Sequence, residues 1–330
     1  MKNNDIKILQ FLAVQKPDVM FRFINRLAVQ AAVIVLDLED ALWDVIQPER
    51  TAELKAKGRK ELVAFAQNYP GIFLQRQIGI RLNKNTGPEF SHDITALAQI
   101  ADIVKFEAVV LTKIETPRDI IDCMSQLSDN RIRYKNLVLI VETKSGIENL
   151  DEIVHTAHNK NIEYIVYGHY DYSLETQQWP FLEFTEAGYW EHVIPIIKRI
   201  EDGHGNFIHP PFFQIYDDRQ FTEIFHRLRT LCKRPFGIIT LAEQQARLCS
   251  MLAEQMAITE EIPLRNSRIY QHDELVYLAE SVRRSFEIKR RSRFSFVFEP
   301  KTGRFISPHV YLAAVRYLES DQNGGNIDRI

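Results

Sequence analysis

The chain has 330 residues, of which 41 are lysine or arginine and 44 are aspartate or glutamate, giving a formal net charge of −3. Hydrophobic residues make up 45% and charged residues 26%, as in a globular protein with a core, and this charge favours neither nucleic acid nor a membrane as a partner. The three cysteines form no CxxC pair, so neither a disulfide framework nor a zinc site is indicated. Without a signal-peptide pattern or a run of about 18 apolar residues, we expect a cytoplasmic protein.

Short apolar runs alternate with segments of helical periodicity along most of the chain. The apolar runs cover residues 8–14, 33–39, 78–83, 107–115, 136–143, 163–171, 206–213 and 236–241. Regular alternation of this kind predicts a parallel sheet, and eight units of this length favour a closed (β/α)8 TIM barrel, an α/β fold, over an open doubly wound sheet. Neither a G-x-G-x-x-G segment nor a P-loop is present, which disfavours a dinucleotide-binding fold.

The alternation stops at about residue 255. Residues 273–291 and 309–320 have helical periodicity, and 294–308 between them suggest a hairpin or a loop. We therefore expect a catalytic TIM-barrel domain over residues 1–255. A C-terminal helical extension over 256–330 is expected to pack on the barrel or on a neighbouring subunit.

Polar residues end most of the apolar runs, and in TIM barrels the C-terminal ends of the strands carry the chemistry. In chain order these residues are Asp37, Glu39 and Asp40, Arg81 and Asn83, Lys113 and Glu115, Glu142, the run from Gly168 to Asp171, His209, and Thr240. Several carboxylates in a small space are tolerated most easily around a cation, and oxygen ligands favour Mg2+. An arginine beside the ion can clamp a substrate carboxylate, so the set suggests a site for a 2-keto acid.

Each of these residues also has a structural alternative. Arg81 could simply pair with Glu39 or Asp40, and Asp37 could belong to a hydrogen-bonded base of the barrel. Lys113 and Glu115 could form a solvated strand end, and the histidines could be satisfied structural residues. The recurrence of such residues at successive strand ends favours the functional interpretation.

Five segments in order resemble the citrate lyase beta subunit-like (CitE-like) family of the HpcH/HpaI aldolase superfamily. They are VLDLEDAL with a downstream Lys55 and Arg59, IRLN, LTKIET, LIVETKSGIENLDEI and YGHYDYSL. The resemblance implies a TIM barrel that assembles as a trimer or hexamer and uses Mg2+. It implies that Glu142 and Asp171 are the metal ligands.

The same resemblance suggests roles for the other residues at the strand ends. Arg81 is expected to bind the carboxylate or keto group of the substrate, with Glu39 and Asp40 beside the metal as further catalytic residues. Lys113 is also expected to contact the substrate. The loop after the sixth strand departs from the family in being unusually aromatic, and we expect its Tyr170 to contact the substrate in a different pocket that Tyr172 and Trp179 also shape.

The chain departs from the pattern of the family at two informative positions. Thr240 lies where Ile-His-Pro is usual after the eighth strand, and Ser307 lies where malyl-CoA-type relatives place an aspartate that acts as acid/base across a subunit boundary. Both departures bear on whether coenzyme A is used and whether catalysis is retained.

The function expected from these features is that of a Mg2+-dependent carbon–carbon lyase or aldolase. Its substrate would be a 2-keto or 3-hydroxy dicarboxylic acid or its thioester, cleaved or formed through an enolate stabilised by the metal. The alternative is a non-catalytic barrel that binds a keto acid or acyl thioester as a sensor or as a subunit of a complex. A third hypothesis, a phosphoenolpyruvate- or pyruvate-handling transferase, would need a phosphate-binding cluster, and no Gly-rich loop of that kind occurs near the seventh or eighth strand.

Overall fold

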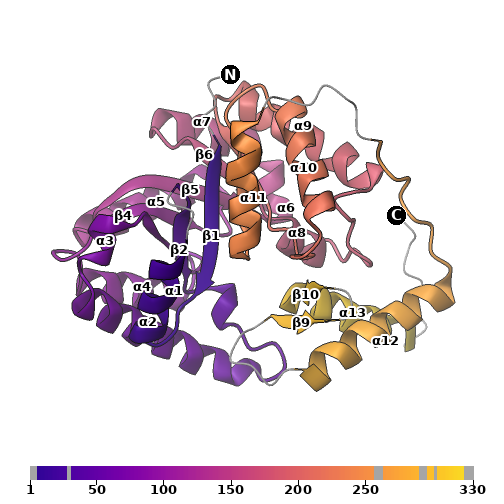
Figure 1. Ribbon diagram of the computed structural model, residues 1–330, viewed down its shortest axis with the longest axis horizontal. Helices are drawn as coiled ribbons and strands as arrows, with labels where there is room; N and C mark the ends of the chain where they lie inside the picture. Colours follow the sequence, from indigo (N-terminus) through magenta and orange to yellow (C-terminus); the bar gives the residue numbers. More distant parts are fainter. Residues whose placement is uncertain (1–5, 28–30, 256–262, 290–295, 301–302, 323–330) are drawn as a thin grey trace.

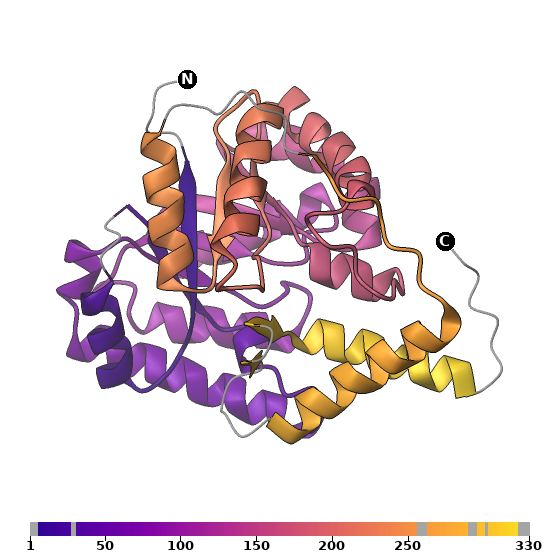
Figure 2. The same ribbon diagram turned by 45° about the vertical axis from the view of Figure 1, so that its right-hand side comes forward.

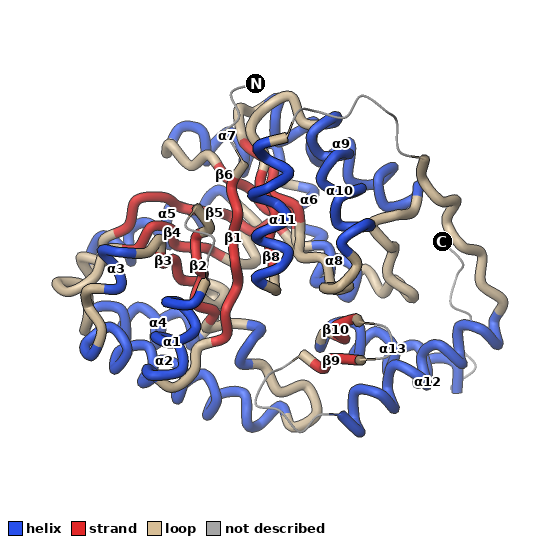
Figure 3. The backbone as a smooth tube through the Cα atoms, in the orientation of Figure 1, coloured by secondary structure: helices blue, strands red, loops and turns tan. Residues whose placement is uncertain are grey.

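The computed structural model describes residues 6–27, 31–255, 263–289, 296–300 and 303–322. Eight parallel strands pair in sequence order and β1 closes on β8, which confirms the predicted TIM barrel (Figures 1 and 3). The strands are β1 Lys7–Ala13, β2 Val33–Asp37, β3 Ile78–Arg81, β4 Phe106–Leu111, β5 Tyr134–Val141, β6 Tyr164–Tyr167, β7 Asn206–His209 and β8 Gly237–Thr240.

The strands are buried on both faces, which explains their continuous apolar sequences. All five residues of β2 are buried. Side chains that point into the barrel form one apolar cluster, with Leu9, Val35, Val110 and Ile140 among its members, and the side chains that point outward pack against the helices. The barrel interior is therefore a packed core, and the side chains available for chemistry lie at the strand ends.

Helices surround the barrel and follow the strands (Figure 3). They begin where the sequence supplies suitable residues: Pro117 opens α5, and Thr116 and Asp119 form a reciprocal capping box there. The barrel helices are α1 Pro17–Arg26, α2 Thr51–Asn68, α3 Ile72–Gln75, α4 Pro88–Ala98, α5 Pro117–Asp129, α6 Lys144–Glu148, α7 Leu150–Asn159, α8 His169–Glu175, α9 Ala187–Asp202, α10 Asp218–Leu231 and α11 Glu243–Glu254, with short 3-10 turns η1 Asp40–Leu42 and η2 Pro48–Arg50.

The C-terminal segment forms α12 His272–Lys289, the hairpin β9 Val297–Glu299 and β10 Arg304–Ile306, and α13 Pro308–Gln322. The two helices lie side by side, beyond the strand ends that carry the acidic residues (Figures 1 and 2). Arg316 Nη1 donates to the Leu174 carbonyl 3.3 Å away in α8, and the backbone N–H of Phe305 donates to the Phe213 carbonyl at 2.9 Å. The segment therefore brings its own residues to the mouth of the barrel.

Among the described residues, no helix is long and apolar enough to cross a membrane.

Candidate active site

The site begins where β2 and β3 lie side by side. Asp37 and Arg81 are partners in the register of these strands, so their side chains emerge at the same height. Arg81 donates from Nε to Asp37 Oδ1 at 2.8 Å and from Nη2 to Asp37 Oδ2 at 2.5 Å, a bidentate pair that fixes the plane of the guanidinium. Asp37 also accepts the backbone N–H groups of Glu39 and Ala41, so it shapes the turn that carries the next two acids.

Glu39 and Asp40 contact the remaining nitrogen of the same arginine. Arg81 Nη1 lies 3.0 Å from Asp40 Oδ2 and 3.1 Å from Glu39 Oε2. Burial opposes ionisation of Asp40, but Arg81 together with Lys113 and His309 outweighs it, so the pKa of this carboxyl is lowered. For Glu39, burial and the neighbouring Asp40 raise the pKa. The ion pairs foreseen as a structural alternative for Arg81 are therefore present, and Arg81 also borders the cavity described below.

Lys113 lies among the carboxylates. Its Nζ is 2.6 Å from Glu39 Oε1, 3.0 Å from Asp171 Oδ1 and 3.8 Å from Glu142 Oε1. Burial opposes its charge, but Asp171 and Glu39 raise its pKa well above the usual value, so it is an ammonium ion rather than an amine nucleophile. Lys113 has a left-handed backbone with φ of 52°, strained for a residue with a side chain, and its N–H donates to Glu142 Oε1 at 3.0 Å.

Glu142 follows β5 and is buried beside the backbone of β6. A Cβ added to Gly168 would lie 2.3 Å from the Glu142 Cβ and 2.5 Å from its Oε2, so the glycine makes the room that Glu142 occupies. Burial, together with the charge of Asp171, raises the pKa of Glu142 well above its usual range. Glu142 therefore holds a proton readily until a cation arrives.

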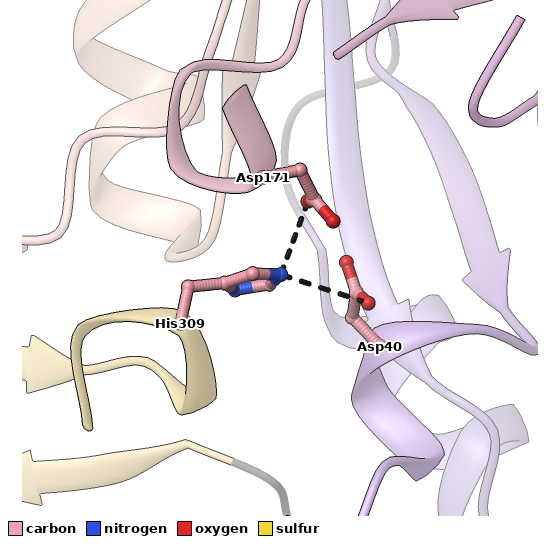
Figure 4. A group of neighbouring side chains, drawn as sticks. All are labelled: Asp40, Asp171 and His309. Carbon is pink, nitrogen blue, oxygen red and sulfur yellow. Dashed lines mark ion pairs between the residues drawn. The ribbon is translucent and has the colours of Figure 1, made fainter. Parts of the chain in front are cut away.

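Asp171 and His309 meet across the mouth of the barrel (Figure 4). His309 Nε2, from the first turn of α13, lies 3.0 Å from Asp171 Oδ2 and 4.0 Å from Asp40 Oδ1. Burial opposes both charges, but each partner favours the charged form of the other, so the pKa of Asp171 is lowered and that of His309 is raised. One ligand atom from each of Asp40, Asp171 and His309 lies within 4.8 Å of the other two, a spacing that could hold a metal ion.

When all of its carboxyl groups are ionised, this site has an excess of negative charge. Five carboxylates share it with two permanent cations and with His309. The carboxylates are those of Asp37, Glu39, Asp40, Glu142 and Asp171, and the cations are Arg81 and Lys113. A divalent cation with a preference for oxygen ligands would balance this excess, so the residues present fit Mg2+.

A cavity of about 480 Å3 opens above these residues. Its charged end is bordered by Arg81, Glu142, Asp171 and His309, and its outer end by Phe213 and the hairpin phenylalanines 296, 298 and 305. A volume of this size suits a small organic molecule. Tyr170 borders it too, with its hydroxyl donating to the Pro211 carbonyl at 2.9 Å. Lys113 is not among the residues that line it.

Other residues singled out in the sequence lie away from the cavity and support the fold. Asn83 donates to the Leu38 carbonyl and to Asp93, and Lys55 donates to Asn83. Glu115 pairs with Lys84 at 2.8 Å.

Residues from the later strands are structural as well. His209 lies 3.1 Å from the Tyr189 hydroxyl, and burial lowers its pKa to about 3, so it is a neutral structural histidine. Thr240 donates to Gln10 at 2.8 Å in the barrel interior. Tyr172 stacks on His192 and Trp179 packs near Tyr317, so neither shapes the described cavity as the sequence suggested.

Two features of the site were missed in the sequence. His309 lies in the predicted C-terminal helix, and nothing near it in the chain ties it to Asp171. The phenylalanines of the hairpin were equally inconspicuous, although their alternation in FSFVF is the pattern of a strand with one aromatic face. Ser307, at the departed position, accepts the backbone N–H of Val310 at 3.2 Å and so caps α13.

The fold and site together define a TIM barrel with a carboxylate-rich mouth whose side chains could hold a cation. The model of the HpcH/HpaI aldolase/citrate lyase family matches residues 7–187, more than half of the chain, and the protein belongs to this family. No curated protein matches the sequence.

Solved structures with the same fold share little sequence with the chain. The citrate lyase beta subunit of Mycobacterium tuberculosis complexed with oxaloacetate and magnesium has 16% identity and a TM-score of 0.55, covering 77% of this chain and 100% of that one. RipC from Yersinia pestis has 16% identity and a TM-score of 0.55, covering 78% and 98%. CitE from M. tuberculosis with magnesium, acetoacetate and coenzyme A has 16% identity and a TM-score of 0.55, covering 96% and 99%.

Proposed function

We propose that this protein is a Mg2+-dependent carbon–carbon lyase or aldolase that acts on a 2-keto or 3-hydroxy acid or its thioester. The observation that carries the proposal is the cluster of five carboxylates around two cations, at the charged end of a cavity in the barrel mouth. Family membership supports this reaction class, and structural neighbours of the same fold were solved with magnesium and oxaloacetate or pyruvate.

The residues would divide the work according to their positions. Glu142 and Asp171 would hold the ion, with Asp40 close enough to Asp171 to contribute. Bound Mg2+ supplies the positive charge that stabilises an enolate of the substrate. Arg81, held in one plane by Asp37, presents its guanidinium to the substrate carboxylate.

The other predicted residues would act around that centre. Glu39 and Asp40 orient Arg81 and complete the negative environment of the ion. Tyr170 borders the substrate, and Lys113 balances the charge of the carboxylates. His309 is placed to exchange a proton near the reacting end, where relatives use an aspartate at the position of Ser307.

A turnover screen with Glu142→Gln tests this proposal. Release of pyruvate from 4-hydroxy-2-keto acids, and of the acid products from 3-hydroxyacyl thioesters, is measured with Mg2+ and with EDTA. We expect turnover that requires Mg2+ and is lost in Glu142→Gln, while Glu107→Gln, an acid at the opposite end of β4, keeps it. Full activity of folded Glu142→Gln would refute the assignment.

A keto-acid-binding barrel without turnover is the second candidate function. One reason is the ammonium group of Lys113, which lies between carboxylates that would otherwise bind the ion. The other is Ser307, which caps a helix at the position where relatives place an acid/base aspartate. Mg2+-dependent binding of keto acids without turnover of any substrate in the screen would support this candidate.

The assembly state and domain arrangement belong to the proposal as well. We propose a homotrimer or hexamer, in which residues 1–255 form the catalytic barrel and 256–330 an extension over its mouth. Light scattering on the purified protein gives the number of subunits directly, and a monomer at micromolar concentration would contradict the assembly.

A further inference from the structure

The cavity has two chemically different ends. At the bottom, Arg81 and the carboxylates form a charged floor. Further out, the walls are rings and aliphatic groups, with Phe11, Phe213 and Phe305 among them. Phe11 joins the two ends, because the Arg81 guanidinium carbon lies 4.9 Å from the centre of its ring. A molecule that fills the cavity therefore needs one polar end and one apolar end.

The aromatic wall is built by contacts between the barrel and the hairpin. The N–H of Phe305 donates to the Phe213 carbonyl at 2.9 Å, and Gln214 forms an antiparallel bridge with Arg304. Phe296 meets the Phe213 ring edge-on at 5.5 Å. The wall is thus held in place before any ligand binds, and its apolar character is a fixed property of the site.

Tyr170 extends this wall toward the ion site. Its ring stacks on Phe213 at 4.1 Å between centroids, and its hydroxyl is already bound to the Pro211 carbonyl. The phenol therefore offers the cavity a ring rather than a free polar group.

Apart from the proposed ion and His309, a single permanent cation in the described part of the chain faces the cavity, and it lies at the charged end. Among the described residues that line the cavity, Arg81 is the only lysine or arginine. A second carboxylate at the far end of a substrate would lie against phenylalanine rings without a cation, and desolvating it there would be unfavourable. The dicarboxylic substrate expected from the sequence does not match this arrangement.

We propose that the substrate is a 2-keto acid with a single carboxylate whose far end is an aromatic ring or a comparably bulky apolar group. This inference rests on the proposed function, since it places the keto acid end at Arg81 and the ion. An aromatic ring suits the outer cavity because ring edges and faces of several phenylalanines are available to it. A cavity of about 480 Å3 accommodates such a molecule.

Calorimetric titration with three acids in the presence of Mg2+ tests the inference: pyruvate, oxaloacetate and phenylpyruvate. We expect phenylpyruvate to bind at least about tenfold more tightly than the other two, a difference of about 1.4 kcal/mol. If pyruvate and oxaloacetate bind but phenylpyruvate binds no more tightly, this inference is overturned while the proposed function stands. If none of the three binds, both are overturned.

Variants of the wall separate specificity from general damage. Phe305→Ala should lower the ratio of phenylpyruvate to pyruvate affinity about tenfold, equivalent to about 1.4 kcal/mol. Tyr216→Ala, which removes an exposed ring that touches Phe298 from outside the cavity, should leave the ratio unchanged. Phe305→Lys should reverse the order in favour of oxaloacetate.

Phe213→Leu provides a second variant in case the hairpin does not tolerate a change at Phe305, because it keeps the apolar volume and removes the ring. It should lower the same ratio. An unchanged ratio in both folded variants would overturn the aromatic assignment.

Discussion

Replacing Lys113 with methionine tests whether its ammonium group competes with Mg2+ for the same carboxylates. The side chain keeps similar length but loses a charge that lies 2.6 Å from Glu39, 3.0 Å from Asp171 and 3.8 Å from Glu142. Removing one partner of a buried ion pair costs about 3–5 kcal/mol. Because 26% of the Lys113 side chain stays exposed, the lower end, about 3 kcal/mol, is expected without Mg2+.

Mg2+ should reduce this loss of stability. An ion at a hundred times its dissociation constant stabilises the folded state by about 2.7 kcal/mol, and at a thousand times by about 4.1 kcal/mol. If removal of the competing ammonium tightens Mg2+ binding about tenfold, the difference in stability between the wild type and Lys113→Met shrinks by about 1.4 kcal/mol.

Urea unfolding of both proteins with Mg2+ and with EDTA measures this change. Lys135→Met is the matched control, because its partner Glu107 lies at the start of β4, away from the site, and its side chain is 63% exposed; a change within about 0.5 kcal/mol is expected. If the wild type and Lys113→Met differ in stability by the same amount with and without Mg2+, Lys113 and the ion do not compete for the same carboxylates.

Three further predictions concern the room for Glu142, the protons of the site and a structural histidine. Gly168→Ala should weaken Mg2+ binding, measured by calorimetry, because its Cβ would displace Glu142; Gly71→Ala, whose Cβ meets nothing within 4 Å, should not. Because burial raises the pKa of Glu142, Mg2+ must displace its proton, so affinity should rise with pH and titrations in two buffers of different ionisation enthalpy should show proton release; a pH-independent affinity would contradict this. Burial lowers the pKa of His209 to about 3, below the 6.5 of an unperturbed histidine, so stability is full above about 6.5 and falls as pH drops below it, by about 1.4 kcal/mol per pH unit. In His209→Gln, the free energy of unfolding measured with urea should depend less steeply on pH between these two pKa values, by about 1.4 kcal/mol per pH unit. An unchanged pH dependence would show that His209 does not carry the effect.

The barrel and the acids at its mouth were predictable because both follow from local order in the chain. Each apolar run overlaps a strand of the barrel, and polar residues that end successive parallel strands must meet at one edge. The acidic turn after β2 and the position of Arg81 at the end of β3 were therefore predictable from the residues that end successive apolar runs.

What the sequence did not reveal depends on contacts between distant segments. His309 reaches Asp171 only because α13 packs against α8, and no periodic pattern encodes that contact. The position of Lys113 among three carboxylates likewise depends on a left-handed backbone turn that its sequence does not announce. The aromatic wall arises where the hairpin meets the loop after β7, again across a long stretch of chain.

The most direct test of a Mg2+-dependent keto acid site is calorimetric titration of the wild type and Asp171→Asn with pyruvate, each with Mg2+ and with EDTA. Asp171 lies against both Lys113 and His309, so its loss should remove the ion without touching Arg81. We predict that the wild type binds pyruvate only with Mg2+ and that Asp171→Asn does not bind it in either condition. Equal pyruvate affinity with Mg2+ and with EDTA, or undiminished binding by Asp171→Asn, would contradict this account.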